Sequence, residues 1–542
     1  MKAIDLYSGI GGWALGLKVA GIDVVASYER WESAAVTEER NLQTPVDRVN
    51  IRTLDSSLLP SDVDIVVGSP PCTGFSFSNR GGFGDIADGL KDIGKFLEIV
   101  ESVRPACWAM ENVPRVKSIL ERELAPEGAL SRFVHLRKTM EIEVIDMSRF
   151  GLPQRRKRCI AGNFDLGLLE QYADSCQGTT LGDVLSQLEK TISRDLNFGV
   201  DLDRSTITEQ VKEPFFDEEE TRINKEAKEY HPVYNGMRFP DPRDEPARTV
   251  TATCTRVSRE SVIVADVVRP RHYRRLTIRE RAALQGFPLT YQFFGNSYSE
   301  KLKMIGNAIP PVFTYYLVHS MLGTPPTEVQ RLSQVGYEHH APEETPSETL
   351  PDRVGRSYPW YRRFWFAIPN LRFKSGTRFD LANSFDEGDV SWNVSFFFGP
   401  STDIRSVPLD ECLFRRIQGL DWIGDAKETI SNALRPVEGK LVSMDLASMQ
   451  RRWSDKDSDA IHPFELLDLL GKAAGTLING LPALPEEELV EFVLQVARES
   501  HPSKKPVGGR KLAQYALPIF VGLLLGSWFN TYIDKVARQE AA

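Results

Sequence analysis

The feature that most constrains the fold is an alternation of short apolar runs and amphipathic stretches over the first 160 residues. Apolar runs typical of buried strands lie at residues 3–7, 24–28, 63–68 and 106–110. Helical patterns lie between them, at residues 13–20, 31–40 and 88–103. Strands that alternate with helices in this way predict an α/β fold, with a doubly wound, mostly parallel sheet covered by helices on both faces.

A glycine-rich turn joins the first expected strand to the first helix. Gly9 and Gly11 lie in this turn, and glycine lets the backbone approach a ligand with no Cβ in the way. Glu29 ends the next strand 20 residues after Gly9, where an acid takes ribose hydroxyls in a doubly wound fold. The pattern favours a nucleotide-type cofactor but does not separate a dinucleotide from S-adenosylmethionine. The alternative is a turn that serves only as a tight connection.

A cysteine follows the third expected strand. Cys72 lies in the sequence Gly68-Ser69-Pro70-Pro71-Cys72, at the carboxyl edge of the sheet, where such folds bind ligands. Two prolines stiffen the chain before it, and glycines at 74, 81, 82 and 84 are typical of a loop that closes over a ligand. A lone cysteine is more often an inert buried residue, but this position favours a nucleophile.

An acid and a basic run complete the candidate site. Glu111 follows the fourth apolar run, so its carboxylate is expected at the same edge of the sheet as Cys72. The alternative is a capping or salt-bridged surface glutamate. The run Arg155–Arg158 and the arginines between Arg269 and Arg281 are candidates for a basic cleft on a chain with a net charge of −9. Solvated surface charge is the alternative for both runs.

Together these residues resemble the motifs of the cytosine-5 DNA methyltransferase family. The motifs that match are I at Asp5–Gly12, IV at Pro71-Cys72, VI at Glu111–Val113, VIII at Gln154–Arg158, IX at Arg275–Pro288 and X at Gly306–Pro311. Six motifs in the family's order across residues 1–322 are very hard to obtain by chance. The resemblance implies the Rossmann-like fold of S-adenosylmethionine-dependent methyltransferases, with a smaller target recognition domain between motifs VIII and IX.

The resemblance also implies catalytic roles, position by position. Cys72 would attack carbon 6 of a cytosine that has been flipped out of double-stranded DNA. Glu111 would hold ring nitrogen 3 and the amino group, Arg158 would contact the carbonyl oxygen of the base, and Arg156 would support the site. A thiolate suits this role because it can add to the ring and leave again, whereas a serine alkoxide is costly to form near pH 7.

Contacts to cofactor and DNA follow from the same resemblance. The expected S-adenosylmethionine contacts are Tyr7, Gly9, Gly11, Glu29, Trp31, Asn50, Ile51, Pro70, Leu90 and Asn307. The expected DNA contacts are Ser76, Ser78 and Arg80, on the loop after Cys72. Two departures from the family pattern, Tyr7 for Phe and Thr73 for Gln, are tolerable. A third is Asn50, which stands where the family usually has an Asp on the adenine amine.

The chain divides into five expected parts. These are a catalytic and cofactor-binding domain at 1–160, a target recognition region at 161–274, the return of the catalytic domain at 275–323, a linker rich in Pro, Glu, Ser and Thr at 324–352, and an α+β extension at 353–542. Pro246–Thr251 resembles a segment found near the end of the family's recognition region. No simple code links such a region to the bases that it reads.

Composition sets the expected environment. None of the six cysteines forms a C-x-x-C pair, so neither a metal site nor a disulfide framework is indicated. The N-terminal residues Met1–Asp5 lack a signal-peptide pattern. We therefore expect a reduced, cytoplasmic setting close to the nucleoid.

The extension contains one long uncharged run, Leu512 to Ile533. Its length suits either a membrane span or a buried helix, and polar residues within it favour the buried helix. The aromatic and basic stretch Tyr358–Phe366 favours a module that binds DNA or other subunits of a defence or restriction system.

The predicted function is sequence-specific methylation of cytosine carbon 5 in DNA, in a restriction–modification or phage-defence system. An RNA cytosine methyltransferase would use the same residues, although the insert between motifs VIII and IX favours DNA. A scaffold with an inactive core is a second alternative, and the intact set of Cys72, Glu111 and Arg158 argues against it. A nicotinamide dehydrogenase would explain the glycine turn alone.

Overall fold

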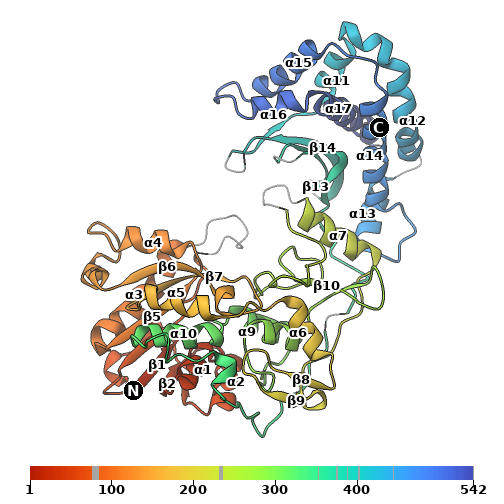
Figure 1. The fold of residues 1–542 in the computed structure, drawn as a ribbon. Coiled ribbons are helices and arrows are strands. Elements are labelled where there is room, and N and C mark those ends of the chain that lie inside the picture. The colour runs from red at the N-terminus through yellow and green to blue at the C-terminus, as the bar shows by residue number, and fades with distance from the viewer. Residues whose placement is uncertain are drawn as a thin grey trace. The chain divides into compact units, whose positions relative to one another are not determined.

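The computed structural model describes residues 1–75, 85–230, 236–351, 353–373, 376–386, 388–400, 403–442 and 445–540 (Figure 1). The chain forms two compact units. The first comprises Met1–Asn224 and Arg238–Arg353, and the second comprises Lys225–Met237 and Val354–Ala542.

A seven-stranded sheet organises the first unit, in the order β3-β2-β1-β4-β5-β7-β6. Its strands are β1 (Lys2–Leu6), β2 (Asp23–Tyr28), β3 (Val46–Asp47), β4 (Ile65–Gly68), β5 (Cys107–Asn112), β6 (Glu141–Asp146) and β7 (Lys157–Gly162). The first five strands are parallel, whereas β7 runs antiparallel to both of its neighbours. The predicted α/β class with a mostly parallel sheet is confirmed.

Two apolar cores cover the two faces of this sheet. Alternate residues of β1 and β4 serve opposite faces: Ala3 and Ile65 belong to one core, and Ile4 and Val66 to the other. This alternation is why central strands read as continuous apolar runs. The helices of the catalytic part are α1 (Gly12–Val19), α2 (Glu32–Leu42), α3 (Ile86–Val103), α4 (Val116–Glu123), α5 (Leu166–Ser175), α8 (Ile278–Leu284), α9 (Tyr298–Asn307) and α10 (Pro311–Met321).

The segment between α5 and α8 has little regular structure. Its elements are α6 (Leu181–Leu188), β8 (Ile192–Arg194), β9 (Asp201–Asp203), α7 (Glu218–Glu229), β10 (Ile263–Ala265) and β11 (Tyr273–Arg275). The strands form two short antiparallel hairpins. Lys225–Met237, which contains the end of α7, groups with the second unit. There Glu226 forms an ion pair with Arg372, whose guanidinium lies 3.4 Å from the ring centre of Tyr230.

The segment predicted as a linker packs along the first unit for much of its length. Leu332 is buried, and the imidazole of His339 lies against Thr290 and the carbonyl oxygen of Asn41. The ammonium of Lys301 donates to the carbonyl oxygen of Ser347. Residues 324–352 therefore have the composition of a linker but pack against the rest of the first unit. Hydrogen bonds of their backbone and side chains hold them there, since they make few apolar contacts.

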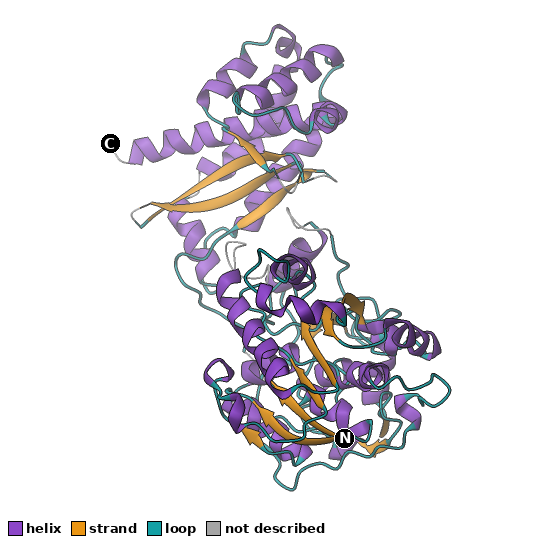
Figure 2. Cartoon of the chain, turned by 90° about the vertical axis from the view of Figure 1, so that its left-hand side faces the viewer, coloured by secondary structure: helices purple, strands orange, loops and turns teal. Residues whose placement is uncertain are grey.

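A four-stranded antiparallel sheet and a group of helices build the second unit (Figure 2). The strands are β12 (Trp365–Arg372), β13 (Arg378–Asp386), β14 (Asp389–Phe398) and β15 (Arg405–Val407). The helices are α11 (Glu411–Gln418), α12 (Lys427–Val442), α13 (Leu446–Ser454), α14 (Pro463–Gly480), α15 (Glu486–Glu499), α16 (Gly509–Gln514) and α17 (Ala516–Glu540).

Helix α17 accounts for the long uncharged run near the C-terminus. Its segment Ala516–Val536 is long and apolar enough to cross a membrane, yet 78% of its most apolar window is buried inside the protein. Gly522 lets the helix approach the ring of Phe379, since a Cβ there would come within 2.3 Å of the ring. Asn530 completes the packing through bonds to the backbone of Val394. The helix is thus a core element of the second unit.

Candidate active site

The loop that carries Cys72 begins where β4 ends at Gly68. The amide of Asn112, at the end of β5, donates to the carbonyl oxygen of Pro70 over 2.9 Å. The backbone N–H of Phe75 donates to the carbonyl oxygen of Cys72. The buried ring of Phe75 lies over Gly89, where a Cβ would come within 2.6 Å of the ring. The loop up to Phe75 is therefore held from both sides.

Glu111 and Arg158 form a buried pair on neighbouring strands. In the antiparallel β5–β7 ladder Glu111 lies opposite Ile160, so Arg158, two residues away on β7, points to the same face. Arg158 Nε donates to Glu111 Oε1 over 2.9 Å, and both side chains are largely shielded from solvent. A carboxylate and a guanidinium are thereby presented side by side.

The surroundings of Cys72 set the chemistry of its thiol. Burial raises the pKa of Cys72, and the negative charge of Glu111 raises it further. The guanidinium groups of Arg158 and Arg156 act in the opposite direction on the same pKa. Cys72 therefore lies within electrostatic range of Glu111 and of both arginines. The opposing effects make thiolate formation dependent on the compensating arginines.

Arg156 is buried and bonds to backbone rather than to acids. It donates to the carbonyl oxygens of Val250, Gly306 and Ala308 over 2.9 to 3.1 Å. Burial holds the pKa of this guanidinium well below its usual range. Its role is to join β7 to the segment around Val250 and to the end of α9.

The glycine turn lies at the carboxyl end of β1. Tyr7, Gly9 and Gly11 all have positive φ, at 56°, 60° and 79°. No atom lies within 4 Å of the Cβ position at Gly9, so the turn is open on that side. The Glu29 carboxylate accepts hydrogen bonds from the backbone N–H groups of Gly9 and Trp31, at 3.0 and 2.7 Å. A hydrogen bond therefore joins the glycine turn to Glu29.

The remaining predicted cofactor residues lie on several elements. Asn50 caps a short 3₁₀ turn by accepting from the backbone N–H of Arg52, and Ile51 is buried beside it. Leu90 and Pro70 are buried, whereas Asn307 is exposed at the end of α9. The hydroxyl of Tyr7 donates to Asp92, at 3.3 Å from Oδ1. The predicted DNA contacts Ser76, Ser78 and Arg80 lie outside the described residues.

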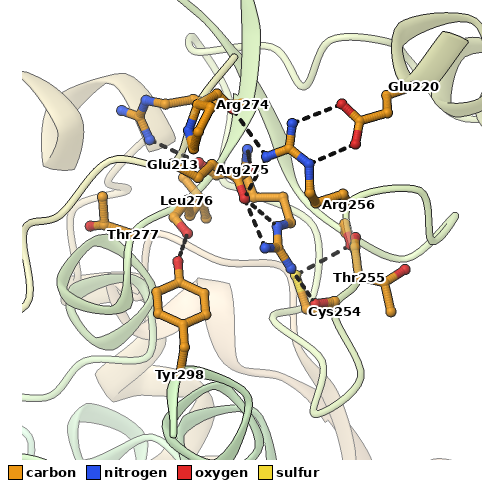
Figure 3. Close-up of polar contacts among 12 residues, drawn as sticks. Glu213, Glu220, Cys254, Thr255, Arg256, Arg274, Arg275, Leu276, Thr277 and Tyr298 are labelled. Atoms are coloured by element: carbon orange, nitrogen blue, oxygen red, sulfur yellow. Dashed lines mark hydrogen bonds and ion pairs between the residues drawn. The ribbon is translucent and has the colours of Figure 1, made fainter. Parts of the chain in front are cut away.

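A buried ion network supports the region beside the site (Figure 3). Glu213 accepts from the guanidinium of Arg275 at 2.8 Å and pairs with Arg256 at 3.1 Å. Arg256 also binds both carboxylate oxygens of Glu220, on α7, at 2.7 and 2.8 Å. A further bond joins Arg275 to the carbonyl oxygen of Cys254. The network thus fastens the segment that follows Val250 to β11.

By sequence, the arginines between Arg269 and Arg281 are candidates for a basic cleft, with solvated surface charge as the alternative, but most of them fit neither description. Arg274, Arg275, Arg279 and Arg281 are buried. Arg274 pairs with Glu280, and Arg279 donates to backbone carbonyls. These arginines lie in the interior, where carboxylates and backbone carbonyls accept their hydrogen bonds. Those that remain on the surface are at the tip of the β10–β11 hairpin.

Comparison with known proteins identifies the family. The family model described as C-5 cytosine-specific DNA methylase matches residues 1–322. This chain belongs to that family. The enzyme is a DNA (cytosine-5-)-methyltransferase, as its motifs predict.

Named relatives match more than half of the methylase over almost their full length. It is 29% identical over 325 residues to the type II methyltransferase M.HgiDI of Herpetosiphon aurantiacus, covering 59% of this chain and 94% of the relative. Type II methyltransferase M.HindV of Haemophilus influenzae is 26% identical over 321 residues, covering 57% and 92%. Both alignments cover more than nine tenths of the relative and less than two thirds of this chain.

Solved structures cover a similar share of the methylase. One is a putative DNA modification methyltransferase encoded within an E. coli prophage, with 19% identity and a TM-score of 0.44 over 60% of this chain and 99% of that one. The S. pombe Dnmt2 methyltransferase has 17% identity and a TM-score of 0.42, over 60% and 98%.

Sequence analysis missed one surface feature in the predicted recognition region. Val267 and Val268, at the tip of the β10–β11 hairpin, are 61% and 82% exposed. A pair of valines is normally interpreted as part of a strand. The cue lies in the flanking residues Asp266 and Pro270, which are typical of a turn.

Proposed function

We propose that this methylase transfers a methyl group from S-adenosylmethionine to carbon 5 of cytosine within a specific sequence of double-stranded DNA. The observation that carries the proposal is the convergence of Cys72 with the Glu111–Arg158 pair at the carboxyl edge of the sheet. Relatives named as type II methyltransferases support a role in restriction–modification or phage defence, in the cytoplasm on nucleoid DNA.

The proposed reaction uses Cys72 as the nucleophile. Its thiolate adds to carbon 6 of a flipped-out cytosine, and the electron pair of the 5,6 double bond makes carbon 5 nucleophilic. Glu111 holds ring nitrogen 3 and the amino group, and Arg158 binds the carbonyl oxygen, so the charge that develops on the ring is stabilised. After carbon 5 is methylated, loss of its proton restores the double bond and expels the thiolate.

The glycine turn fits S-adenosylmethionine, which supplies the electrophilic methyl group. The open space at Gly9 leaves room for a ligand against the backbone. The Glu29 carboxylate has about four lone pairs, and backbone N–H groups occupy two of them. The remaining two are available for ribose hydroxyls. Trp31, Ile51, Leu90 and Pro70 would supply apolar walls, and Asn50 and Asn307 polar contacts.

Replacing Glu29 by glutamine tests this cofactor site. Loss of the charge is expected to weaken S-adenosylmethionine binding on the order of tenfold or more, because hydrogen bonds to charged groups are worth about 1.5–3 kcal/mol. Calorimetric titration of the full-length protein with S-adenosylmethionine measures the change. Glu32→Gln, at an exposed acid on α2, is the matched control and should bind as the parent does. Equal affinities of the two variants would contradict the assignment.

The tip of the β10–β11 hairpin is the proposed reader of DNA sequence. Val267, Val268, Arg269 and Arg271 are all exposed there. Asp266 Oδ1 accepts from the backbone N–H groups of Val268 and Arg269, which fixes the turn. The base of the hairpin is held by the Arg275–Glu213 pair. Arginines recognise guanine edges in the major groove, and a valine methyl group suits the methyl group of thymine.

Alanine substitutions at Arg269 and Arg271 are expected to relax the choice of target sequence. Loss of a base contact costs about 1–3 kcal/mol of discrimination, whereas loss of a phosphate contact weakens all sequences alike. Sequencing of 5-methylcytosine in plasmid DNA methylated by each variant measures the outcome. Arg132→Ala, at an arginine of the first unit that is 59% exposed, is the control. An unchanged methylation pattern in both hairpin variants would remove the hairpin from recognition.

A further inference from the structure

The predicted cofactor site has walls from three separate parts of the first unit. The glycine turn after β1 carries Tyr7, the 3₁₀ turn Ile51–Thr53 follows β3, and α3 carries Leu90. Ile51 and Leu90 belong to one apolar core, against which Tyr7 packs. Apolar burial is not directional, so the spacing of these walls has to be set by other contacts.

A fork of hydrogen bonds from Arg52 joins the second wall to the third. Its guanidinium donates to both carboxylate oxygens of Asp92, at 2.9 and 2.6 Å, and to both of Asp88, at 2.9 Å each. These acids lie four residues apart on α3 and therefore on the same side of the helix, with Leu90 between them in the sequence. A bidentate guanidinium fixes direction as well as distance. Because Arg52 directly follows Ile51, the fork sets the separation of Ile51 from α3.

The first wall is bonded to the same carboxylate. Tyr7 Oη donates to Asp92 Oδ1 over 3.3 Å. Burial raises the pKa of Tyr7, and the negative charge of Asp92 raises it further, so the hydroxyl keeps its proton. The side chain of Asp92 is 7% exposed and that of Asp88 is 46% exposed, so water screens mainly the second pair. Asp92 therefore lies on one wall and holds the other two.

The start of α3 has a separate attachment to the loop of Cys72. The ring of Phe75 lies against Gly89, where a Cβ would come within 2.6 Å of it. This contact involves neither Arg52 nor Asp92. The cofactor walls and the Cys72 loop are thus held to α3 by different contacts.

We infer that Asp92 is a positioning residue for S-adenosylmethionine, which holds Tyr7 and Arg52 so that the three walls keep the spacing that the adenosine part of the cofactor requires. The inference rests on the proposed function, which places the cofactor among these walls. Asp92 acts through the residues that it holds and takes no part in methyl transfer itself.

Calorimetric titration of full-length Asp92→Asn, with S-adenosylmethionine and separately with S-adenosylhomocysteine, tests this role. The amide keeps one acceptor but turns N–H groups toward those of Arg52, so the fork loosens. Both ligands should bind about tenfold more weakly and by the same factor, because they share the adenosine. The rate of methylation at saturating cofactor should stay close to that of the parent, since Phe75 still holds the Cys72 loop. Glu98→Gln, at a half-exposed acid on the same helix, is the matched control and should bind both ligands as the parent does.

A second variant tests whether Asp92 acts through Arg52. Arg52→Lys keeps the charge but not the planar fork, and its side chain is 32% exposed, so this variant should fold even if Asp92→Asn does not. It should also weaken the binding of both ligands. The double variant should bind no more weakly than the weaker of the two single variants, because both changes break the same contact.

Three results would overturn the inference. The first is a loss confined to S-adenosylmethionine, whose sulfonium gives it a net positive charge, since Asp92 would then act by its charge and not by spacing. The second is parental affinity in a folded Asp92→Asn or Arg52→Lys variant, which would leave the pair a role in stability alone. The third is losses that add in the double variant. If the parent protein binds neither ligand, the proposed function fails and this inference fails with it, so the parent's own titration distinguishes the two cases.

Discussion

Replacement of Cys72 by serine is expected to reduce DNA methylation by at least about 10³-fold, as removal of a catalytic nucleophile does in other enzymes. A hydroxyl is much harder to ionise than a thiol, and the same burial that raises the pKa of Cys72 would disfavour an alkoxide still more. Transfer of labelled methyl groups from S-adenosylmethionine to duplex DNA measures the loss. Cys412→Ser, at an exposed cysteine of the second unit, is the matched control and should retain full activity.

A second readout separates the nucleophile from a structural cysteine. In DNA with fluorine in place of hydrogen on carbon 5 of the target cytosine, no proton can be lost after methylation, so the thiolate cannot be expelled. The parent protein should then form a complex with DNA that survives denaturation, and Cys72→Ser should not. A denaturation-resistant complex in the variant, or substantial methylation by it, would assign the covalent step to another residue.

Removing the carboxylate of Glu213 is expected to have the largest effect on stability. Glu213 and Arg275 are each about 1% exposed, and loss of one partner leaves the other charge buried without compensation. Breaking such a pair costs about 3–5 kcal/mol. Urea denaturation of Glu213→Ala, monitored on the transition of the first unit, measures this cost. Glu39→Ala, which breaks the more exposed pair with Arg48, should change stability by no more than about 1 kcal/mol.

A double variant distinguishes charge from packing at this pair. Glu213→Leu with Arg275→Met replaces both charges by apolar groups of similar size, so no unpaired charge remains there. We expect it to be more stable than Glu213→Ala, since buried pairs exchanged for apolar residues often cost little. If the double variant is the less stable of the two, the loss reflects hydrogen bonds to the backbone rather than the buried charge.

The local sequence pattern was sufficient to predict the central sheet and the edge of it that carries the candidate active site. The apolar runs at β1, β2, β4 and β5 are buried on both faces, so composition alone marks them. The strand ends then place Glu111 beside the loop of Cys72, because parallel strands end at the same edge. This prediction requires no knowledge of distant contacts.

The burial of Arg275 and Arg156 depends on contacts with residues far away in the sequence. It could therefore not be predicted from the local pattern. Arg275 is buried because Glu213 lies 62 residues earlier in the chain and faces it. Arg156 is buried because three backbone carbonyls from later segments converge on it. An arginine run has the same sequence pattern whether its side chains contact solvent, DNA or buried acids.

The end of α7 and the residues that follow it bear on how this enzyme can change during evolution. Lys225–Met237 lies within the segment predicted to be the target recognition region but groups with the second unit, where Glu226 and Tyr230 contact Arg372. Recombination that exchanged the recognition region for that of a shorter relative would remove these partners and expose the Arg372 site. We therefore expect such an exchange to preserve the fold of the second unit only when a C-terminal unit that fits the new segment is inherited with it.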